Sequence, residues 1–182
     1  MKKKILLGLS FILLFCMVGC DNLMNTPTKK VEEFLSKYHD TDSAVLNQLD
    51  YVLDSEYSLD NNQRDSYKTI MKRQYQNITY TIKDEVVDGD SATVIVEIEV
   101  YDYNKTIREA DIYLLSNQEE FLDEERVVNV SKFMDYKLEQ MKKTTERVKY
   151  TLDFSLVKKD KEWTLEDISE IDRQKIHGIY NY

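Results

Sequence analysis

The sequence has few cysteines, prolines and glycines, and the positions of these few residues are informative. Both cysteines, Cys16 and Cys20, fall within the first 20 of 182 residues, so the rest of the chain cannot form an internal disulfide. A domain formed by these residues must rely on packing instead. The one proline is Pro27, and beyond residue 20 the only glycines are Gly89 and Gly178. Helices and strands therefore meet few chain breakers along most of the sequence.

Net positive charge is also lacking. The formal net charge is −9. Because Lys2 to Lys4 belong to a segment predicted below to be removed, the side chains that follow sum to about −12, a charge typical of a soluble surface. Nucleic acids and anionic lipid headgroups are bound through basic patches. The composition therefore argues against nucleic acid as a partner and against membrane attachment through surface charge.

Recognisable catalytic and metal-binding motifs are absent as well. The sequence has no Gly-rich phosphate loop, no serine-centred nucleophile elbow and no paired catalytic carboxylates, so we predict no catalytic residue, no cofactor and no metal site. Asp88-Gly89-Asp90 lacks the remaining ligands of a calcium loop and is interpreted as a turn. The two histidines, His39 and His177, lie at a predicted helix end and in the C-terminal tail. A surface or capping role is predicted for both.

The first 20 residues have the layout of a bacterial secretion signal. Three lysines precede a mostly apolar run at residues 5–18, and about 14 residues are short for a helix that spans a bilayer, which needs about 20. The tetrad Met17-Val18-Gly19-Cys20 resembles the lipobox of bacterial lipoproteins, with Met in place of the usual Leu. The resemblance implies that the Cys20 thiol receives diacylglycerol and that the chain is cut just before it.

This resemblance predicts the organisation of the whole chain. Residues 1–19 are interpreted as the signal peptide, residues 20–28 as a lipidated tether and residues 29–182 as a single domain. The expected partner of the lipid on Cys20 is the membrane itself. Each CH₂ of an acyl chain that is buried in the bilayer contributes roughly 0.8 kcal/mol to membrane binding. The predicted location is the cell membrane, facing outside the cytoplasm. An ordinary signal peptide with a coincidental cysteine, or an uncleaved anchor, is the alternative.

Hydrophobic spacing predicts three amphipathic helices after the tether. The first begins at Thr28, the second begins near Ser43 as a possible cap, and the third covers residues 59–77. Their apolar stripes consist of Val31, Phe34, Leu35 and Tyr38, then Leu46, Leu49 and Leu53, then Tyr67, Ile70, Met71, Tyr75 and Ile78.

From residue 78 on, apolar and polar residues alternate, which is the pattern of a strand. Residues 78–87 and 91–103 alternate around Asp88-Gly89-Asp90, and an Asp-Gly pair between apolar runs is a strong hairpin signal. Helical spacing returns over residues 104–143, with a charged, loop-like stretch in its middle. Residues 148–156 alternate again.

The remaining elements close the predicted fold. Lys158 to Lys161 are interpreted as a turn that leads to a short strand around Trp163. Residues 169–177 are predicted to form a last helix, with Gly178 directly after it.

This order predicts an α+β fold in which N-terminal helices pack on a curved antiparallel sheet, with an extra helical segment between the strand pairs. The chain resembles the NTF2-like or cystatin-like fold and, more narrowly, a group of Firmicute lipoproteins with such domains. The resemblance is carried by residues 26–38, residues 71–103 and Lys175-Ile176-His177-Gly178. It implies fold and location, and it brings no established activity and no catalytic residues.

Aromatic residues supply the candidate binding residues. Thirteen tyrosines and one tryptophan are present, and an aromatic ring with a polar tip suits a ligand pocket. Aromatic residues also favour strands for packing reasons alone, so core packing is the alternative. The candidates on predicted strands are Tyr80, Tyr101, Tyr103, Tyr150 and Trp163.

Three functions are compatible with these features. The first is a non-catalytic, lipid-anchored binding or interaction module for a small ligand, a cell-wall component or an envelope protein. The second is an enzyme of the dehydratase or isomerase type, which would use an NTF2-like pocket for proton transfer. The third is a domain that positions other envelope proteins without a small ligand.

Overall fold

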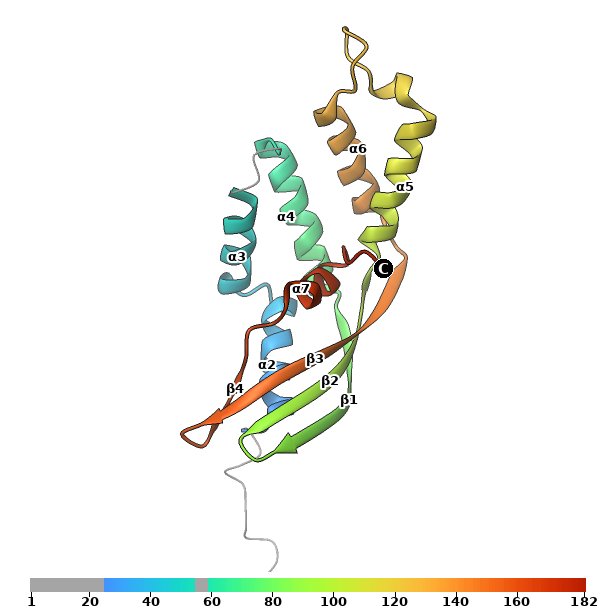
Figure 1. The fold of residues 1–182 in the computed structure, drawn as a ribbon. Coiled ribbons are helices and arrows are strands. Elements are labelled where there is room, and N and C mark those ends of the chain that lie inside the picture. The colour runs from blue at the N-terminus through green and yellow to red at the C-terminus, as the bar shows by residue number, and fades with distance from the viewer. Residues whose placement is uncertain (1–24, 55–58) are drawn as a thin grey trace, which may run out of the picture.

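The computed structural model describes residues 25–54 and 59–182 (Figure 1). In chain order, the elements are α2 (Pro27–His39), α3 (Ser43–Asp54), α4 (Asn61–Gln76), β1 (Thr79–Asp88), β2 (Ser91–Tyr101), α5 (Tyr103–Ser116), the 3₁₀ helix η1 (Gln118–Phe121), α6 (Val130–Lys143), β3 (Arg147–Lys159), β4 (Glu162–Leu165) and α7 (Glu170–His177).

The four strands form one antiparallel sheet in the order β1-β2-β3-β4, and helices pack on one of its faces. Figure 1 shows α2 lying across the sheet, while the α3–α4 and α5–α6 pairs extend beyond one end of it. The α5–α6 pair is the predicted helical insertion between the strand pairs. The α+β class with N-terminal helices packed on the sheet is confirmed, and the finer NTF2-like or cystatin-like assignment stays a prediction.

Side-chain caps set where most helices begin. Thr26 accepts a hydrogen bond from the Lys29 amide ahead of Pro27, whose fixed φ suits the first turn of α2. Asp60 and Gln63 form a reciprocal capping box at α4. The α2 helix thus begins one residue before the predicted start, so part of the predicted tether belongs to the folded body.

A cap also explains one wrong strand boundary. The sequence predicts a strand over residues 91–103, but β2 ends at Tyr101. The Asp102 side chain accepts a hydrogen bond from the Lys105 amide at 2.9 Å and starts α5, so Tyr103 is helical. Similarly, Asp42 rather than Ser43 accepts the hydrogen bond from the Ala44 amide before α3. In both places, short polar side chains compete with the hydrophobic period.

The core lies between the sheet and the helices that cover it. Ala92, Val94, Val96, Ile98 and Val100 of β2 are all buried, as their alternation predicts. These side chains and their neighbours on β3 pack against α2, α4 and α7. The helices therefore cover this face of the sheet over β2 and β3, the two central strands.

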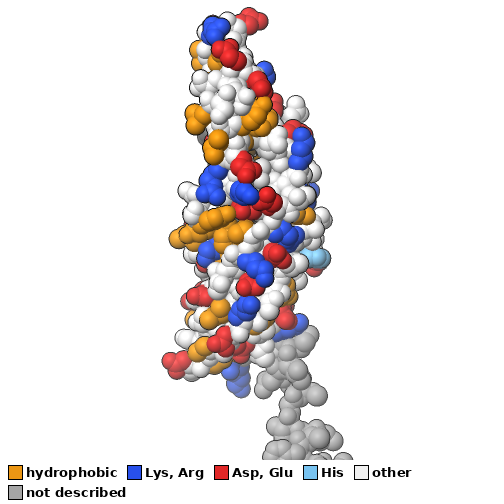
Figure 2. Space-filling view, turned by 90° about the vertical axis from the view of Figure 1, so that its right-hand side faces the viewer, with side chains coloured by type: hydrophobic (Ala, Val, Ile, Leu, Met, Phe, Trp, Pro, Cys, Tyr) orange, Lys and Arg blue, Asp and Glu red, His pale blue; other side chains and the backbone are white. Residues whose placement is uncertain are grey.

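The α5–α6 pair forms an arm whose α6 helix is held to α4 at two places along its length. On α4, the Gln63 amide nitrogen donates to Asp135 Oδ1 at 2.9 Å, and Arg73 Nη1 donates to the Lys142 carbonyl at 2.7 Å. Exposed apolar side chains, among them Ile112 and Leu115, lie on the arm. Figure 2 shows hydrophobic side chains distributed over this upper part of the molecule, with mixed charges over the sheet.

Candidate functional site

A cleft of about 370 Å³ lies between three helices rather than on the sheet. Tyr67 and Tyr75 of α4 form one wall, Leu49 of α3 contributes to a second, and α7 supplies the charged side chains and His177. Its volume is at the lower end of the usual range for small-ligand sites, which is about 300–1,000 Å³. The mainly apolar lining with a few convergent polar groups is typical of such sites.

The cleft contains a tyrosine–histidine pair. The Tyr75 hydroxyl and His177 Nε2 lie 3.0 Å apart, and their ring centroids are separated by 5.7 Å. Tyr75 is 1 % exposed, and Tyr38 of α2 packs edge-on against its ring. Three elements thus fix the position of the Tyr75 hydroxyl, and this hydroxyl in turn orients the imidazole.

One turn before His177, Arg173 brings a positive charge to the cleft. Its Nε lies 3.5 Å from Glu170 Oε2, and the side chains are 25 % and 73 % exposed, respectively. The arginine is therefore half-buried at the cleft wall, while its acidic partner extends into solvent. Because Glu170 is mostly in solvent, its pair with Arg173 contributes little, and another anion can take its place.

These surroundings fix the protonation states in the cleft. Burial, and secondarily the Arg173 charge, lowers the pKa of His177 from 6.5 to about 4. Burial raises the pKa values of Tyr38, Tyr67 and Tyr75 above 10. At neutral pH the imidazole and the phenols are therefore uncharged. The charged side chains on the cleft are then Arg173 and its partner Glu170, and the remaining polar groups offer hydrogen bonds.

A second hollow, of about 470 Å³, also involves α3 and α4 but differs in character. It is lined mainly by charged and polar side chains of these helices, including Asp50, Asp65 and Lys68. Within the described residues, no group of three or more His, Cys, Asp or Glu is placed to hold a metal ion. No helix in that part of the chain combines the length and apolar character needed to cross a bilayer.

Of the residues predicted to line a pocket, two lie where β2 meets α5. Tyr103 is 0 % exposed, and its hydroxyl donates to the Ile70 carbonyl at 3.4 Å. The Tyr101 ring lies beneath two guanidinium groups, with Arg73 at 4.1 Å and Arg147 at 5.0 Å from its centroid. The two tyrosine rings are 6.0 Å apart, and both serve the packing of α4 against the sheet.

The other three predicted residues are scattered over the sheet. Tyr150 is buried on β3 against Tyr180 of the C-terminal segment, and Trp163 is buried on β4. Tyr80 lies on β1, is 41 % exposed and borders a hollow of about 70 Å³. None of the five predicted residues lines the cleft between α3, α4 and α7.

Sequence reasoning missed the cleft because its polar residues come from helices far apart in the chain. The sequence predicts a surface or capping role for His177, whereas the structure places it partly buried against Tyr75, 102 positions away. The available signal was the pairing of Arg173 and His177 at a spacing of one helical turn. His39, by contrast, is exposed at the end of α2, as predicted.

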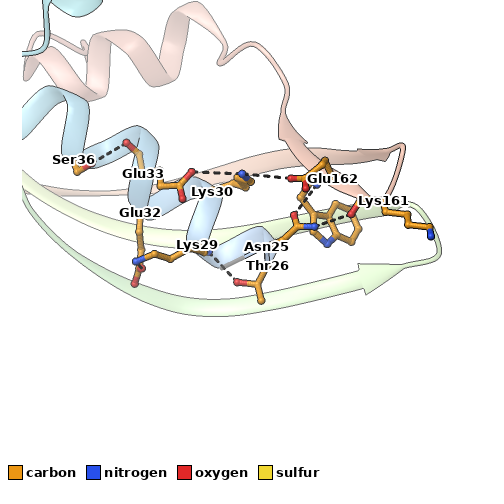
Figure 3. Close-up of polar contacts among 10 residues, drawn as sticks. Asn25, Thr26, Lys29, Lys30, Glu32, Glu33, Ser36, Lys161 and Glu162 are labelled. Atoms are coloured by element: carbon orange, nitrogen blue, oxygen red, sulfur yellow. Dashed lines mark hydrogen bonds and ion pairs between the residues drawn. The ribbon is translucent and has the colours of Figure 1, made fainter. Parts of the chain in front are cut away.

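The predicted lipidation site, Cys20, and the signal peptide lie outside the described residues. The described chain starts at Asn25, which is fixed to the β3–β4 turn (Figure 3). Asn25 Nδ2 donates to the Lys161 carbonyl at 2.7 Å, and its Oδ1 accepts from the Trp163 amide at 3.0 Å. The chain therefore enters the domain at a defined point.

Comparison with known proteins yields one structural likeness. No protein-family model and no curated protein matches the chain. Among solved structures, it is similar to the crystal structure of ycdA from Bacillus subtilis subsp. subtilis str. 168, provisionally described as a lipoprotein, with 16 % identity and a TM-score of 0.43. The alignment covers 97 % of this chain and 55 % of that one, so the chain spans about half the length of ycdA.

Proposed function

We propose that the protein is a non-catalytic binding module, held by a lipid on Cys20 at the outer face of a cell membrane. The proposed ligand site is the cleft between α3, α4 and α7. The observation that carries this proposal is the combination of a mainly apolar hollow of about 370 Å³ with the convergent polar groups of Tyr75, Arg173 and His177. The anchor rests on the lipobox-like tetrad that ends in Cys20.

The chemistry of the cleft supports binding over proton transfer. A general base works best when its pKa lies near the operating pH, whereas the pKa of His177 is lowered to about 4. Glu170, the one carboxylate on the cleft among described residues, is 73 % exposed and paired with Arg173. The imidazole is thus a weak base at neutral pH, and the Glu170 carboxylate extends towards solvent rather than into the cleft.

The alternative, an enzyme of the dehydratase or isomerase type, is favoured by one observation: an imidazole lies inside an apolar hollow. It predicts that a substrate is turned over and that His177→Gln lowers kcat far more than it changes KM. A binding module predicts that ligands which occupy the cleft are released unchanged.

Two experiments test the proposal. For the anchor, Cys20→Ala should release the protein from membranes or leave an uncleaved precursor, and lipid labelling that persists in this variant would reject the assignment. For the cleft, Val45→Trp should fill the hollow with an indole, because Val45 is a partly buried wall residue. The neutral fluorescent probe N-phenyl-1-naphthylamine should then lose its saturable binding.

A matched control separates filling from a general effect of the added indole. Val86 is 53 % exposed on β1, away from the cleft, so Val86→Trp should leave probe binding intact. Equal loss in both variants, or loss in neither, would contradict a ligand site in the cleft.

A further inference from the structure

We propose that the ligand of the cleft is a small aromatic or alicyclic anion, whose acidic group pairs with Arg173 while its ring lies between Tyr67 and Leu49. This inference rests on the proposed binding role of the cleft and adds the chemical class of the ligand. The ring of the ligand would contact the aromatic and aliphatic side chains of α3 and α4, and its acidic group would contact the one arginine of α7.

The first support is the arrangement of the guanidinium group. Within residues 25–54 and 59–182, its described polar contact is the one from Nε to Glu170 at 3.5 Å. A guanidinium has five N–H donors in a planar fork, and both Nη atoms are then available to a carboxylate, sulfonate or phosphate. A bidentate pair with a ligand would exceed the single contact to Glu170 in strength.

The second support is the direction in which the Arg173 charge acts. The same arginine lowers the pKa of His177 and opposes the rise in the pKa values of Tyr38 and Tyr75, whereas Glu170 has no resolved effect on these three groups. Of the two charged side chains on the cleft wall, it is therefore Arg173 whose charge reaches the buried groups, although the whole chain has a net charge of −9.

A cationic ligand is the competing chemistry. Tyrosine rings around a hollow can bind a quaternary ammonium group through cation–π interactions, and Tyr38, Tyr67 and Tyr75 all border the cleft. The half-buried guanidinium of Arg173 opposes such a ligand, because like charges repel strongly where solvent screening is reduced. The observations therefore favour the anion.

The test compares two probes that share one fluorophore. 8-Anilinonaphthalene-1-sulfonate carries a sulfonate, and N-phenyl-1-naphthylamine has the same rings without it. All variants are made in the full chain with Cys20→Ala, so that any probe bound by residues 1–24 is a common background. Arg173→Gln should weaken binding of the sulfonate probe about tenfold, as expected for a charge-assisted hydrogen bond, and change binding of the neutral probe less than about twofold.

Three further variants complete the design. Arg126→Gln removes the same charge from an exposed pair with Glu119 on the arm and should leave the affinity for both probes unchanged. Glu170→Gln removes the competing carboxylate and should tighten sulfonate binding. Arg173→Lys keeps the positive charge and should retain more affinity for the sulfonate probe than Arg173→Gln, and circular dichroism melts verify that each variant is folded.

The outcomes separate the two proposals. If Val45→Trp affects neither probe, the binding role of the cleft fails. If Val45→Trp blocks both probes but Arg173→Gln weakens both equally or neither, the cleft binds ligands and the anion assignment fails. Displacement of the neutral probe by benzyltrimethylammonium but not by 1-naphthoate would also overturn the anion assignment.

Discussion

The Tyr75 hydroxyl lies 3.0 Å from His177 Nε2, and this contact joins the last turn of α4 to the last residue of α7. It is the polar centre of the cleft, and it is surrounded by rings and aliphatic side chains. The contact therefore makes the stability of the fold and the chemistry of the cleft depend on the same two residues.

The first prediction concerns pH. The pKa of His177 falls from 6.5 in the unfolded chain to about 4 in the folded one, so the unfolded state binds more protons between these values. The free energy of unfolding should therefore fall as the pH is lowered from 6.5 towards 4, by at most about 3 kcal/mol from this group. Urea unfolding across this window measures it.

The histidine variants isolate the effect of His177 from that of the carboxylates. His177→Gln should lose this part of the pH dependence, and His39→Gln, which alters an exposed histidine, should keep it. Equal slopes in wild type and His177→Gln would show that His177 does not change its pKa on folding.

A second prediction isolates the hydrogen bond itself. Tyr75→Phe removes only the hydroxyl and leaves the buried imidazole nitrogen without its partner, which should cost about 1–2 kcal/mol of unfolding free energy. A double-mutant cycle with His177→Leu should give a coupling energy of about 1 kcal/mol. Tyr80→Phe, at a ring that is 41 % exposed, should change stability by less than about 0.5 kcal/mol. Additive effects in the cycle would argue against a direct contact in solution.

The third prediction compares the two glycines of the folded body. Both have positive φ, +59° at Gly89 and +71° at Gly178, but only at Gly178 would a Cβ collide, with the Tyr101 carbonyl and the Gln74 amide nitrogen. Gly89→Ala should therefore cost about 1 kcal/mol for its backbone conformation, and Gly178→Ala clearly more, about 3 kcal/mol or above. Similar losses at both sites, measured by urea unfolding, would mean that α7 does not pack closely against the end of β2.

The fourth prediction concerns Gln74, whose side-chain amide pairs with the backbone of β2 in the way that a neighbouring strand would. Gln74 is fully buried, its amide nitrogen donates to the Tyr101 carbonyl at 3.1 Å, and its Oε1 accepts from the Tyr101 amide at 2.9 Å. Gln74→Leu leaves both backbone groups unpaired and should cost about 2–4 kcal/mol. Gln76→Leu, at an exposed position of the same helix, should be nearly neutral. A tolerated Gln74→Leu would show that water reaches the end of β2.

Local sequence signals predicted the elements well wherever periodicity and capping agreed. The hairpin at Gly89, the alternation of β2 and the final helix before Gly178 all follow from residue type and spacing. The errors lie at boundaries such as that at Tyr103, where the side chain of Asp102 decides between strand and helix. The outcome depends on a single hydrogen bond, and the spacing of hydrophobic residues contains no information about that bond.

The candidate site was not predictable in the same way. The predicted pocket residues are aromatic residues on predicted strands, but helices pack against the buried side chains of the sheet and the cleft lies among the helices themselves. Its polar group His177 meets Tyr75 only through the packing of α7 on α4. A contact between residues so distant in sequence carries no local pattern.

The two hydrogen bonds of Asn25 bear on which end of the domain would face the membrane. They fix the start of the fold beside the β3–β4 turn, at the end of the sheet that also carries the β1–β2 turn (Figures 1 and 3). With Cys20 acylated as proposed, the five intervening steps of chain span at most about 17 Å. The strand turns would then rest near the lipid headgroups, and the tip of the α5–α6 arm would be the part of the protein that extends farthest from the bilayer.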